Sequence, residues 1–349
     1  MALKHTKRLS RAIMASILWQ TGITRPSVRA RNRLSIATFH RVLPKPLIQE
    51  YPFPGLCVTP EDLDWVLGYF VRHYSCGTLE DCMHRHDASE RGTRPLLAIT
   101  FDDAQSDNYV HARPILSKHD VKATFFAPAK NIESGIPLWH DRLAYAVLRA
   151  IQSNRPGTLE LLPDSPDPRV TNQGIARMIV SEAKNCTPER LDDLLTRLST
   201  IAKMEPEVLT RVPEWAGMMS WKDLRSLHEA GHEIGSHSLT HSILIHMPDH
   251  QLQQEFEESK RMIEDHIDHQ VASFCYPNGD YDDRCLQLLR EHKYQQACST
   301  QWGSNEDLKN RYALRRFDIV SSHMRRASGA LSRAILAWRM SGLYPGLSS

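Results

Sequence analysis

Two adjacent carboxylates and two histidines four residues apart are the residues of this chain best suited to chemistry. Asp102 and Asp103 directly follow the apolar run 96–101, and His237 and His241 come much later. Two imidazoles and one carboxylate oxygen can hold a divalent cation and leave a coordination position for water, as in catalytic rather than structural metal sites. The second carboxylate would then be free to take a proton from that water. The pattern indicates a metal-dependent hydrolase.

Both pairs fall where a buried strand is expected to end. Residues 96–101 have the length and apolar content of such a strand, and residues 231–241 read as a short strand that breaks into a helical turn at His237. The carboxyl ends of parallel strands meet at one rim of an α/β barrel, where active sites lie. Taken separately, an Asp-Asp pair is often a solvated strand end, and a His-x-x-x-His pair often decorates a helix. Two such sets at one rim favour the metal site.

Three short motifs contain these residues, and together they resemble the polysaccharide deacetylase family, which shares the chitooligosaccharide deacetylase homology domain. The motifs are residues 100–103 (TFDD), 236–241 (SHSLTH) and 274–279 (FCYPNG), the last in a Phe-x-Tyr-Pro-x-Gly version. The resemblance extends from about Ser35 to Ile319. It implies an α/β fold, a distorted (β/α)7-type barrel, and one divalent metal ion, usually Zn²⁺, with Co²⁺ or Ni²⁺ as alternatives.

The resemblance also implies roles for individual residues. The metal ligands would be Asp103, His237 and His241, and Asp102 would be the general base. The reaction would hydrolyse the acetamide of an N-acetylated sugar, in a polysaccharide or in a lipid-linked precursor, and release acetate and a free amine. Because the departing amine needs a proton, and similar members supply it from a histidine before the aspartate motif, His40 is the candidate general acid.

Two departures from the commonest motifs bear on this site. Ala104 follows the aspartate pair where glycine is usual, so the turn there is expected to differ in backbone angle. Cys275 stands where many members carry an arginine that pairs with the base. Arg316, which follows a late strand, is the candidate replacement partner of Asp102, although a surface arginine would fit the sequence equally well.

Three further residues are candidates for substrate contacts. By the resemblance, the main-chain N–H of Asn278 would face the oxyanion of the tetrahedral intermediate. Trp139 and Trp302 offer flat apolar faces that match the C–H groups of sugar rings. For both tryptophans, core packing explains the residue better.

Composition is consistent with an enzyme that has a sizeable core. The chain has 349 residues, 41% of them apolar, and a formal net charge of +2. There is no basic stripe with interleaved aromatics, so no nucleic acid partner is predicted. Its seven cysteines are scattered and odd in number, which favours a reducing compartment over a disulfide framework.

The chain divides into a central barrel and two basic ends. We expect a basic amphipathic segment over 1–33, the deacetylase barrel over 34–320 with a mainly helical insertion at about 137–218, and a second basic amphipathic segment over 321–349. The insertion would shape substrate access at the catalytic rim. It combines a helical pattern over 143–151, a proline-rich stretch and a helical pattern over 175–201.

The two ends could contact a membrane surface. In the first, Lys4, Lys7, Arg8 and Arg11 surround Leu9, Ile13, Met14, Ile17 and Leu18; in the second, Arg325, Arg326, Arg333 and Arg339 surround Leu331, Ile335 and Trp338. Such segments can lie on an anionic membrane, or they can pack on the barrel or on each other, and both interpretations stay open. A secretory signal fits the first segment less well. We therefore expect a cytoplasmic protein, peripheral to the membrane if the first interpretation holds.

Two alternatives to the N-deacetylase stay open. The same site could cleave an ester, which would make the protein an O-deacylase of glycans. The departures at Ala104 and Cys275 also allow a non-catalytic carbohydrate-binding barrel. The three predicted metal ligands (Asp103, His237 and His241) and the base Asp102 are all present. This argues against the second alternative, because a protein that only binds carbohydrate does not need the complete set.

Overall fold

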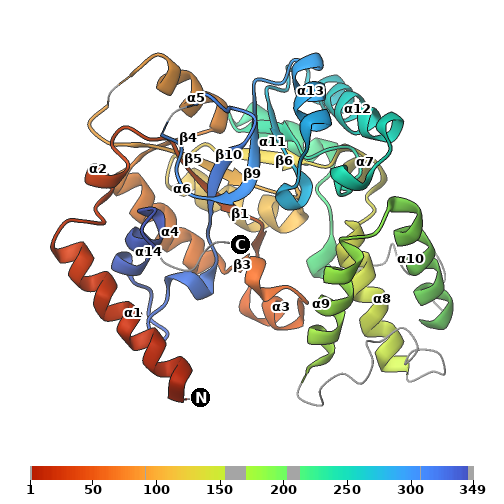
Figure 1. Cartoon of the computed structure of the whole chain (residues 1–349), viewed down its shortest axis with the longest axis horizontal. Coiled ribbons are helices and arrows are strands. Elements are labelled where there is room, and N and C mark those ends of the chain that lie inside the picture. Colours follow the sequence, from red (N-terminus) through yellow and green to blue (C-terminus); the bar gives the residue numbers. More distant parts are fainter. Residues whose placement is uncertain (1, 91, 154–169, 203–212, 307, 345–349) are drawn as a thin grey trace.

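Seven parallel strands form a closed barrel in the computed structural model of the chain (Figure 1), which describes all residues except 1, 91, 154–169, 203–212, 307 and 345–349. The strands follow one another around the barrel in the order β1, β10, β9, β8, β7, β6 and β5, and β5 pairs with β1 to close it. They are β1 (Ser35–Phe39), β5 (Leu96–Phe101), β6 (Thr124–Ala127), β7 (Glu233–Ser236), β8 (Ser273–Cys275), β9 (Gln296–Trp302) and β10 (Leu314–Asp318). The fold is therefore the predicted (β/α)7 barrel.

The remaining strands lie outside this ring. The short strand β4 (Ser75–Gly77) pairs with the first half of β5, and β6 pairs with its last two residues. Strands β2 (Arg41–Val42) and β3 (Cys57–Val58) form a separate parallel pair. Because β2 begins two residues after β1 ends, this pair lies beyond the carboxyl end of the barrel strands.

The apolar run of β5 is buried along its whole length, as expected for a strand of a parallel barrel. Its side chains alternate between two apolar clusters. Leu97, Ile99 and Phe101 belong to the cluster that includes the surrounding helices, whereas Leu96 and Ala98 belong to a cluster drawn mainly from the strands. This alternation directs Thr100, and Asp102 after it, toward the barrel interior.

Amphipathic helices cover the outside of the barrel. They are α4 (Pro60–His73), α5 (Leu79–Asp87), α6 (Arg113–Lys118), α11 (Trp221–Glu229), α12 (Asp249–Ile267) and α13 (Asp283–Glu291), with a π-helical turn at Asn108–Ala112. Side-chain caps fix several starting points. Thr59 caps α4, and Ser220 forms a capping box with Asp223 at the start of α11. Both caps satisfy main-chain N–H groups of the first helical turn and so define where these helices begin.

A helical insertion stands beside the barrel at the lower right of Figure 1. After α7 (Ala129–Ser134), it contains α8 (Trp139–Ser153), α9 (Asn172–Ala183) and α10 (Pro188–Ala202), which share their own apolar cluster. The single helical pattern expected over 175–201 is wrong, because the chain breaks after α9 and restarts at Pro188, a residue suited to the first turn of a helix. The proline-rich stretch with Pro163, Pro166 and Pro168 lies outside the described residues.

The two ends of the chain pack against each other. Helix α1 (Ala2–Gln20) lies along α14 (Arg333–Met340), and the two share the apolar cluster of Ala15, Ile335 and Trp338. Residues 334–340 are all buried, so α14 packs into the protein rather than facing outward. The short helices α2 (Pro26–Arg29) and α3 (Lys45–Glu50) complete the fold. Within the described residues, no helix combines the length and the apolar character needed to cross a bilayer.

Candidate active site

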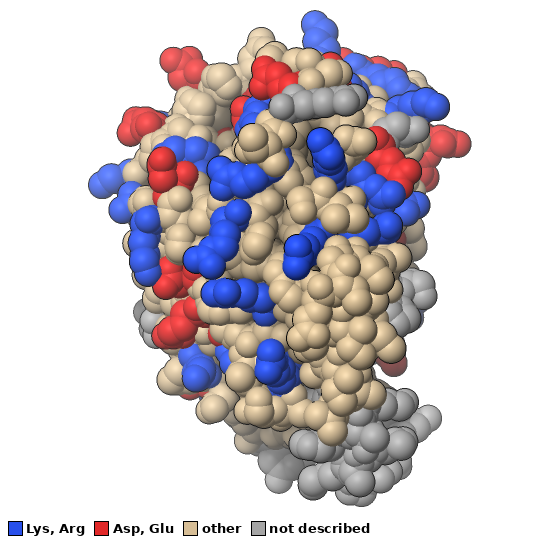
Figure 2. All heavy atoms as spheres, turned by 90° about the vertical axis from the view of Figure 1, so that its left-hand side faces the viewer, with Lys and Arg blue, Asp and Glu red and all other residues tan. Residues whose placement is uncertain are grey.

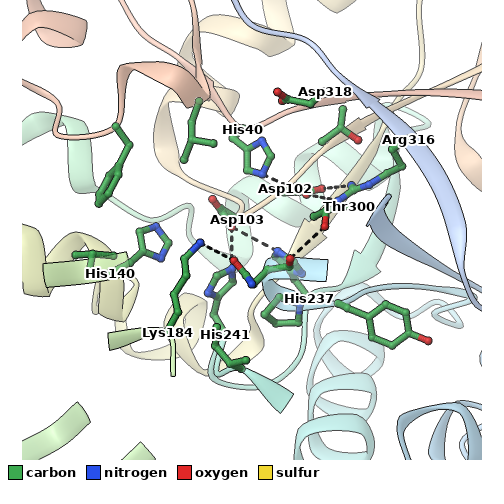
Figure 3. A pocket seen from close by; sticks show the side chains of 18 of the residues that line it. His40, Asp102, Asp103, His140, Lys184, His237, His241, Thr300, Arg316 and Asp318 are labelled. Atoms are coloured by element: carbon green, nitrogen blue, oxygen red, sulfur yellow. Dashed lines mark hydrogen bonds and ion pairs between the residues drawn. The ribbon is translucent and has the colours of Figure 1, made fainter. Parts of the chain in front are cut away.

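A cavity of about 450 Å³ opens at the carboxyl ends of the strands. All of the site residues predicted from the sequence line it: His40, Asp102, Asp103, His237, His241, Asn278 and Arg316. Figure 3 labels all of these except Asn278. Arg316 lies on β10, and the others come from the segments that directly follow β1, β5, β7 and β8. Residues that are distant in sequence are brought together because parallel strands end at one rim.

The aspartate pair lies on a left-handed turn at the end of β5. Asp102 extends the sheet, since its N–H donates to the carbonyl of Phe39 (2.9 Å). Asp103 (φ 74°) and Ala104 (φ 48°) then adopt positive φ angles. Ala104 therefore occupies a conformation that favours glycine, at a cost of roughly 1–2 kcal/mol. Its carbonyl accepts a hydrogen bond from Met219 N–H (3.0 Å), which ties the turn to the segment before α11.

Asp103 and the two histidines converge on one point. Asp103 Oδ1 lies 3.4 Å from His237 Nε2 and 3.1 Å from His241 Nε2, and all three side chains are buried. Donor atoms at 2.0–2.1 Å from a tetrahedral cation are roughly 3.3 Å apart. The spacing, burial and donor types therefore fit a divalent metal ion such as Zn²⁺.

Hydrogen bonding orients His237 toward this point. Its Nδ1 lies 2.7 Å from the carbonyl oxygen of Cys275, so Nδ1 carries a proton and donates it. The lone pair is then on Nε2, the atom that faces Asp103. Metal-binding histidines are commonly oriented in this way through their second ring nitrogen.

The loop after β7 carries the two histidines, and the helical turn expected at His237 is wrong. Residues 237–243 form no helix, and Ser238 (φ 65°) and His241 (φ 58°) adopt left-handed conformations. A buried carboxylate holds this loop. Glu255 of α12 accepts hydrogen bonds from the main-chain N–H groups of residues 239 and 240 (2.8 and 3.0 Å), which fixes the loop in this non-helical path.

Asp102 forms a buried, bidentate ion pair with Arg316. Nη1 donates to Oδ1 and Nη2 to Oδ2, each at 2.8 Å, while Arg316 Nε donates to the carbonyl of Ser299 (2.9 Å). Burial alone raises the pKa of Asp102, but Arg316, together with His40, outweighs it and holds that pKa below its ordinary value. The thiol of Cys275 is 3.7 Å from Asp102 Oδ2. Asp102 thus has a guanidinium partner, Arg316 on β10, beside Cys275.

His40 lies on another side of Asp102. Its Nε2 is 3.5 Å from Asp102 Oδ2, and its side chain is 19% exposed at the cavity wall. Asn108 holds the main chain here, since its Nδ2 donates to the carbonyl of His40 (2.8 Å). His40 is therefore within reach of both the carboxylate and a molecule in the cavity.

The 274–279 motif ends in a tight turn at the cavity edge. Asn278 has φ 59°, and its carbonyl accepts a hydrogen bond from Thr300 Oγ1 (3.2 Å). Gly279 (φ 84°) packs so closely on Thr300 that an added Cβ would lie 2.1 Å from its Oγ1. Lys184, the residue after α9, donates to Asn278 Oδ1 (2.5 Å), so the insertion contacts this turn.

The two candidate tryptophans differ in their surroundings. Trp139 is buried, and its Nε1 donates to the main-chain carbonyl of His241 (3.0 Å). Core packing and support of the histidine loop therefore account for it. Trp302 is only partly buried, lines the cavity and meets Phe317 edge-on at 5.4 Å, so one part of its indole faces the cavity.

Several buried polar residues near the cavity have no counterpart in the sequence predictions. Glu255 is one. Its place on the apolar face of α12, directly before Phe256, is the sequence feature that could have identified it as a buried carboxylate. A second is His140, whose ring lies 5.4 Å from that of His241 and whose pKa is lowered by burial to about 3. A third is Asp141, which accepts from Gln105 Nε2 (2.6 Å). These contacts join the insertion to the barrel.

Comparison with known proteins identifies the chain as a hydrolase with a barrel fold. The family model described as polysaccharide deacetylase matches residues 89–297, and the chain belongs to that family. Its members are hydrolases that cleave carbon–nitrogen bonds other than peptide bonds and remove acetyl groups from N-acetylated sugars. No curated protein matches the chain in sequence.

Solved structures share the fold. The deacetylase PplD of Streptococcus pyogenes, solved in complex with acetate, has a TM-score of 0.56 and 17% identity, over 83% of this chain and 94% of its own. IcaB from Ammonifex degensii has a TM-score of 0.53 and 14% identity, over 83% and 93%. At these identities, the likeness concerns the fold alone.

Proposed function

We propose that the protein is a metal-dependent N-deacetylase of an amino sugar in a polysaccharide or in its lipid-linked precursor. One observation carries the proposal: a buried Asp102–Arg316 ion pair lies directly beside the converging Asp103, His237 and His241. A site that only binds sugar needs neither a buried metal-ligand set nor an ionised carboxylate next to it. The combination suits hydrolysis, in which a water molecule must lose a proton beside a cation.

The chain's residues divide the reaction between them. Asp103, His237 and His241 would hold the cation, and the chemistry that such a cation supplies is carbonyl polarisation and a lowered pKa of water. Asp102, kept ionised by Arg316, takes the proton of the attacking water. The main-chain N–H of Asn278 faces the oxyanion.

Departure of the amine completes the reaction. His40 donates a proton to the nitrogen as the carbon–nitrogen bond breaks, and acetate and a free amine result. Asp102 then holds a proton that His40 has lost. Because Asp102 Oδ2 and His40 Nε2 are 3.5 Å apart, transfer of that proton returns both groups to their starting states.

The two departures that favoured a binding-only barrel are both accommodated. Ala104 adopts the left-handed conformation of the turn, and Arg316 supplies the guanidinium that Cys275 cannot. The base therefore keeps a cationic partner. An O-deacylase would use the same groups, and the nature of the acetyl bond is a matter for the substrate assay.

Two substitutions test the assignment of roles. Asp103→Ala should abolish retention of Zn²⁺, measured by mass spectrometry after gel filtration, whereas Asp102→Asn should retain the metal and lose acetate release. Asp193→Asn, on the exposed surface of α10, serves as the control and should change neither. Near-normal acetate release by Asp102→Asn would show that another group is the base.

A further inference from the structure

Helix α1 has an apolar face that the protein does not cover. Opposite the side that packs on α14, Leu9, Ile13 and Ile17 follow one another at intervals of four residues and are 50%, 55% and 49% exposed. Exposed large hydrophobic side chains are concentrated here: within the described residues, only three lie outside 9–28. Those in this range are Leu9, Ile13, Met14, Ile17, Ile23 and Val28. A contiguous row of this kind marks an interaction surface.

Charge is segregated onto the same part of the molecule. Residues 1–33 and 319–349, which contain α1 and α14, have twelve Lys and Arg and no Asp or Glu, whereas the rest of the chain has 31 Lys and Arg against 41 Asp and Glu. Figure 2 shows the side of the molecule that carries α1. Basic side chains are spread over the middle of this face, and acidic ones lie mainly toward its upper and left-hand edges. The apolar row therefore lies in a basic surrounding.

A cleft of about 410 Å³ lies beside the apolar row, between α1 and the start of α14. Ser16 and Gln20 line it, and each follows an exposed isoleucine by three residues, which places them next to the row. Two exposed arginines and the rings of two tryptophans also line it. These are Arg326, Arg333, Trp19 and Trp65. No carboxylate is among the described residues that line the cleft, so the guanidinium groups are suited to a phosphate.

We propose that α1 docks this protein on an anionic lipid bilayer. Leu9, Ile13 and Ile17 enter the boundary between headgroups and acyl chains, and Arg326 and Arg333 receive lipid phosphates. A bilayer fits better than a protein partner, because a narrow apolar row with cations beside it matches the layering of apolar chains and phosphates. The indoles of Trp19 and Trp65 line the cleft beside this row, and tryptophan is favoured at the interface between headgroups and acyl chains.

Docking would also set the position of the catalytic cavity. Arg333 begins α14 beside the cleft, and Arg339, near the end of the same helix, lines the catalytic cavity. A single buried helix thus connects the docking surface with the cavity wall. Binding to lipid does not use the catalytic residues, so it is measurable whether or not the proposed reaction is correct.

Flotation with lipid vesicles tests the docking surface in the full-length protein. The protein should float with vesicles of phosphatidylcholine and phosphatidylglycerol, and not with phosphatidylcholine alone. Ile13→Ser/Ile17→Ser should lower the partition coefficient about 100-fold, at roughly tenfold for each isoleucine. Val110→Ser/Met178→Ser is the matched control, since both side chains are exposed but lie on other elements.

A second pair of variants tests the arginines separately. Arg326→Gln/Arg333→Gln should weaken binding about 25-fold at low salt, at about fivefold for each charge. Arg197→Gln/Arg261→Gln removes two exposed arginines elsewhere and should leave binding unchanged. Absence of binding to anionic vesicles, or equal binding to neutral ones, would overturn the proposal. So would a dimer, seen by light scattering, that the isoleucine variant dissociates, because a second copy would then cover the row.

Discussion

Replacement of Arg316 by methionine should both move the pH dependence of catalysis and destabilise the fold. In the intact protein, Arg316 donates two hydrogen bonds of 2.8 Å to Asp102, and both side chains are buried. An opposite charge at this distance lowers the pKa of a carboxyl group by about 1–3 units. Its loss should therefore move the acidic limb of kcat/KM to higher pH by about that amount.

The same substitution leaves a carboxylate buried without its partner. Loss of one member of a buried ion pair costs about 3–5 kcal/mol, which corresponds to a Tm lower by about 6–10 °C at roughly 2 °C for each kcal/mol. In the wild type, the lowered pKa of Asp102 gives stability that is present above the unfolded pKa and is lost as the pH falls through the folded pKa. In the variant, the raised pKa reverses this sign. Its deficit in Tm should therefore be largest at neutral pH and shrink on acidification.

Acetate release at several pH values and thermal unfolding followed by circular dichroism measure the two effects. Arg315→Met is the matched control, since Arg315 is the exposed neighbour on the same strand and should cause neither change. Arg316→Lys keeps the charge but loses the bidentate geometry, so its shifts should be smaller. An acidic limb and a Tm that both stay in place in Arg316→Met would refute the assignment of Arg316 as the partner of the base.

Three further substitutions have distinct expected outcomes. His40→Asn should lower hydrolysis of an N-acetyl sugar about 10²–10⁴-fold but affect 4-nitrophenyl acetate much less, because its leaving group needs no proton; equal losses would exclude His40 as the general acid. Glu255→Ala should weaken Zn²⁺ binding about 10–100-fold in a chelator competition, whereas Glu257→Ala, exposed on the same helix, should not. Burial raises the pKa of Asp141 to about 7, so its protonated form stabilises the fold below about pH 4, and this contribution is lost as the pH rises through about 7. Asp141→Asn should therefore keep its Tm better than the wild type across that range; a parallel decline of both would show that Asp141 does not titrate there.

The barrel could be expected from the resemblance to the deacetylase family, and the positions of its key residues follow from local patterns. The run 96–101 ends in two aspartates, and a parallel strand places such residues at the rim. Arg316 was also within reach, since the absence of an arginine at Cys275 required a partner from another strand. The three-dimensional structure was needed to decide whether Arg316 pairs with Asp102 or lies on the surface.

Other features depend on contacts between segments that are far apart in the sequence. The loop after β7 has a helix-like spacing of histidines, but Ser238 and His241 adopt left-handed conformations, and Glu255, on a later helix, holds the N–H groups between them. The break before Pro188 allows α9 and α10 to pack on α8, a choice made by their shared apolar cluster. Lys184 reads as a surface lysine until its helix is placed beside the 274–279 turn. No local pattern of residues contains this information.

The most direct test of the central claim is acetate release from a panel of N-acetylated and O-acetylated glycans. The wild-type protein would be supplied with Zn²⁺, Co²⁺ or Ni²⁺, and a parallel series would contain a chelator. The proposed mechanism predicts acetate from N-acetylated sugars, a free amine in equal amount, and loss of both with the chelator. Acetate from O-acetylated glycans alone would contradict N-deacetylation, and release that persists in the chelator would contradict metal dependence.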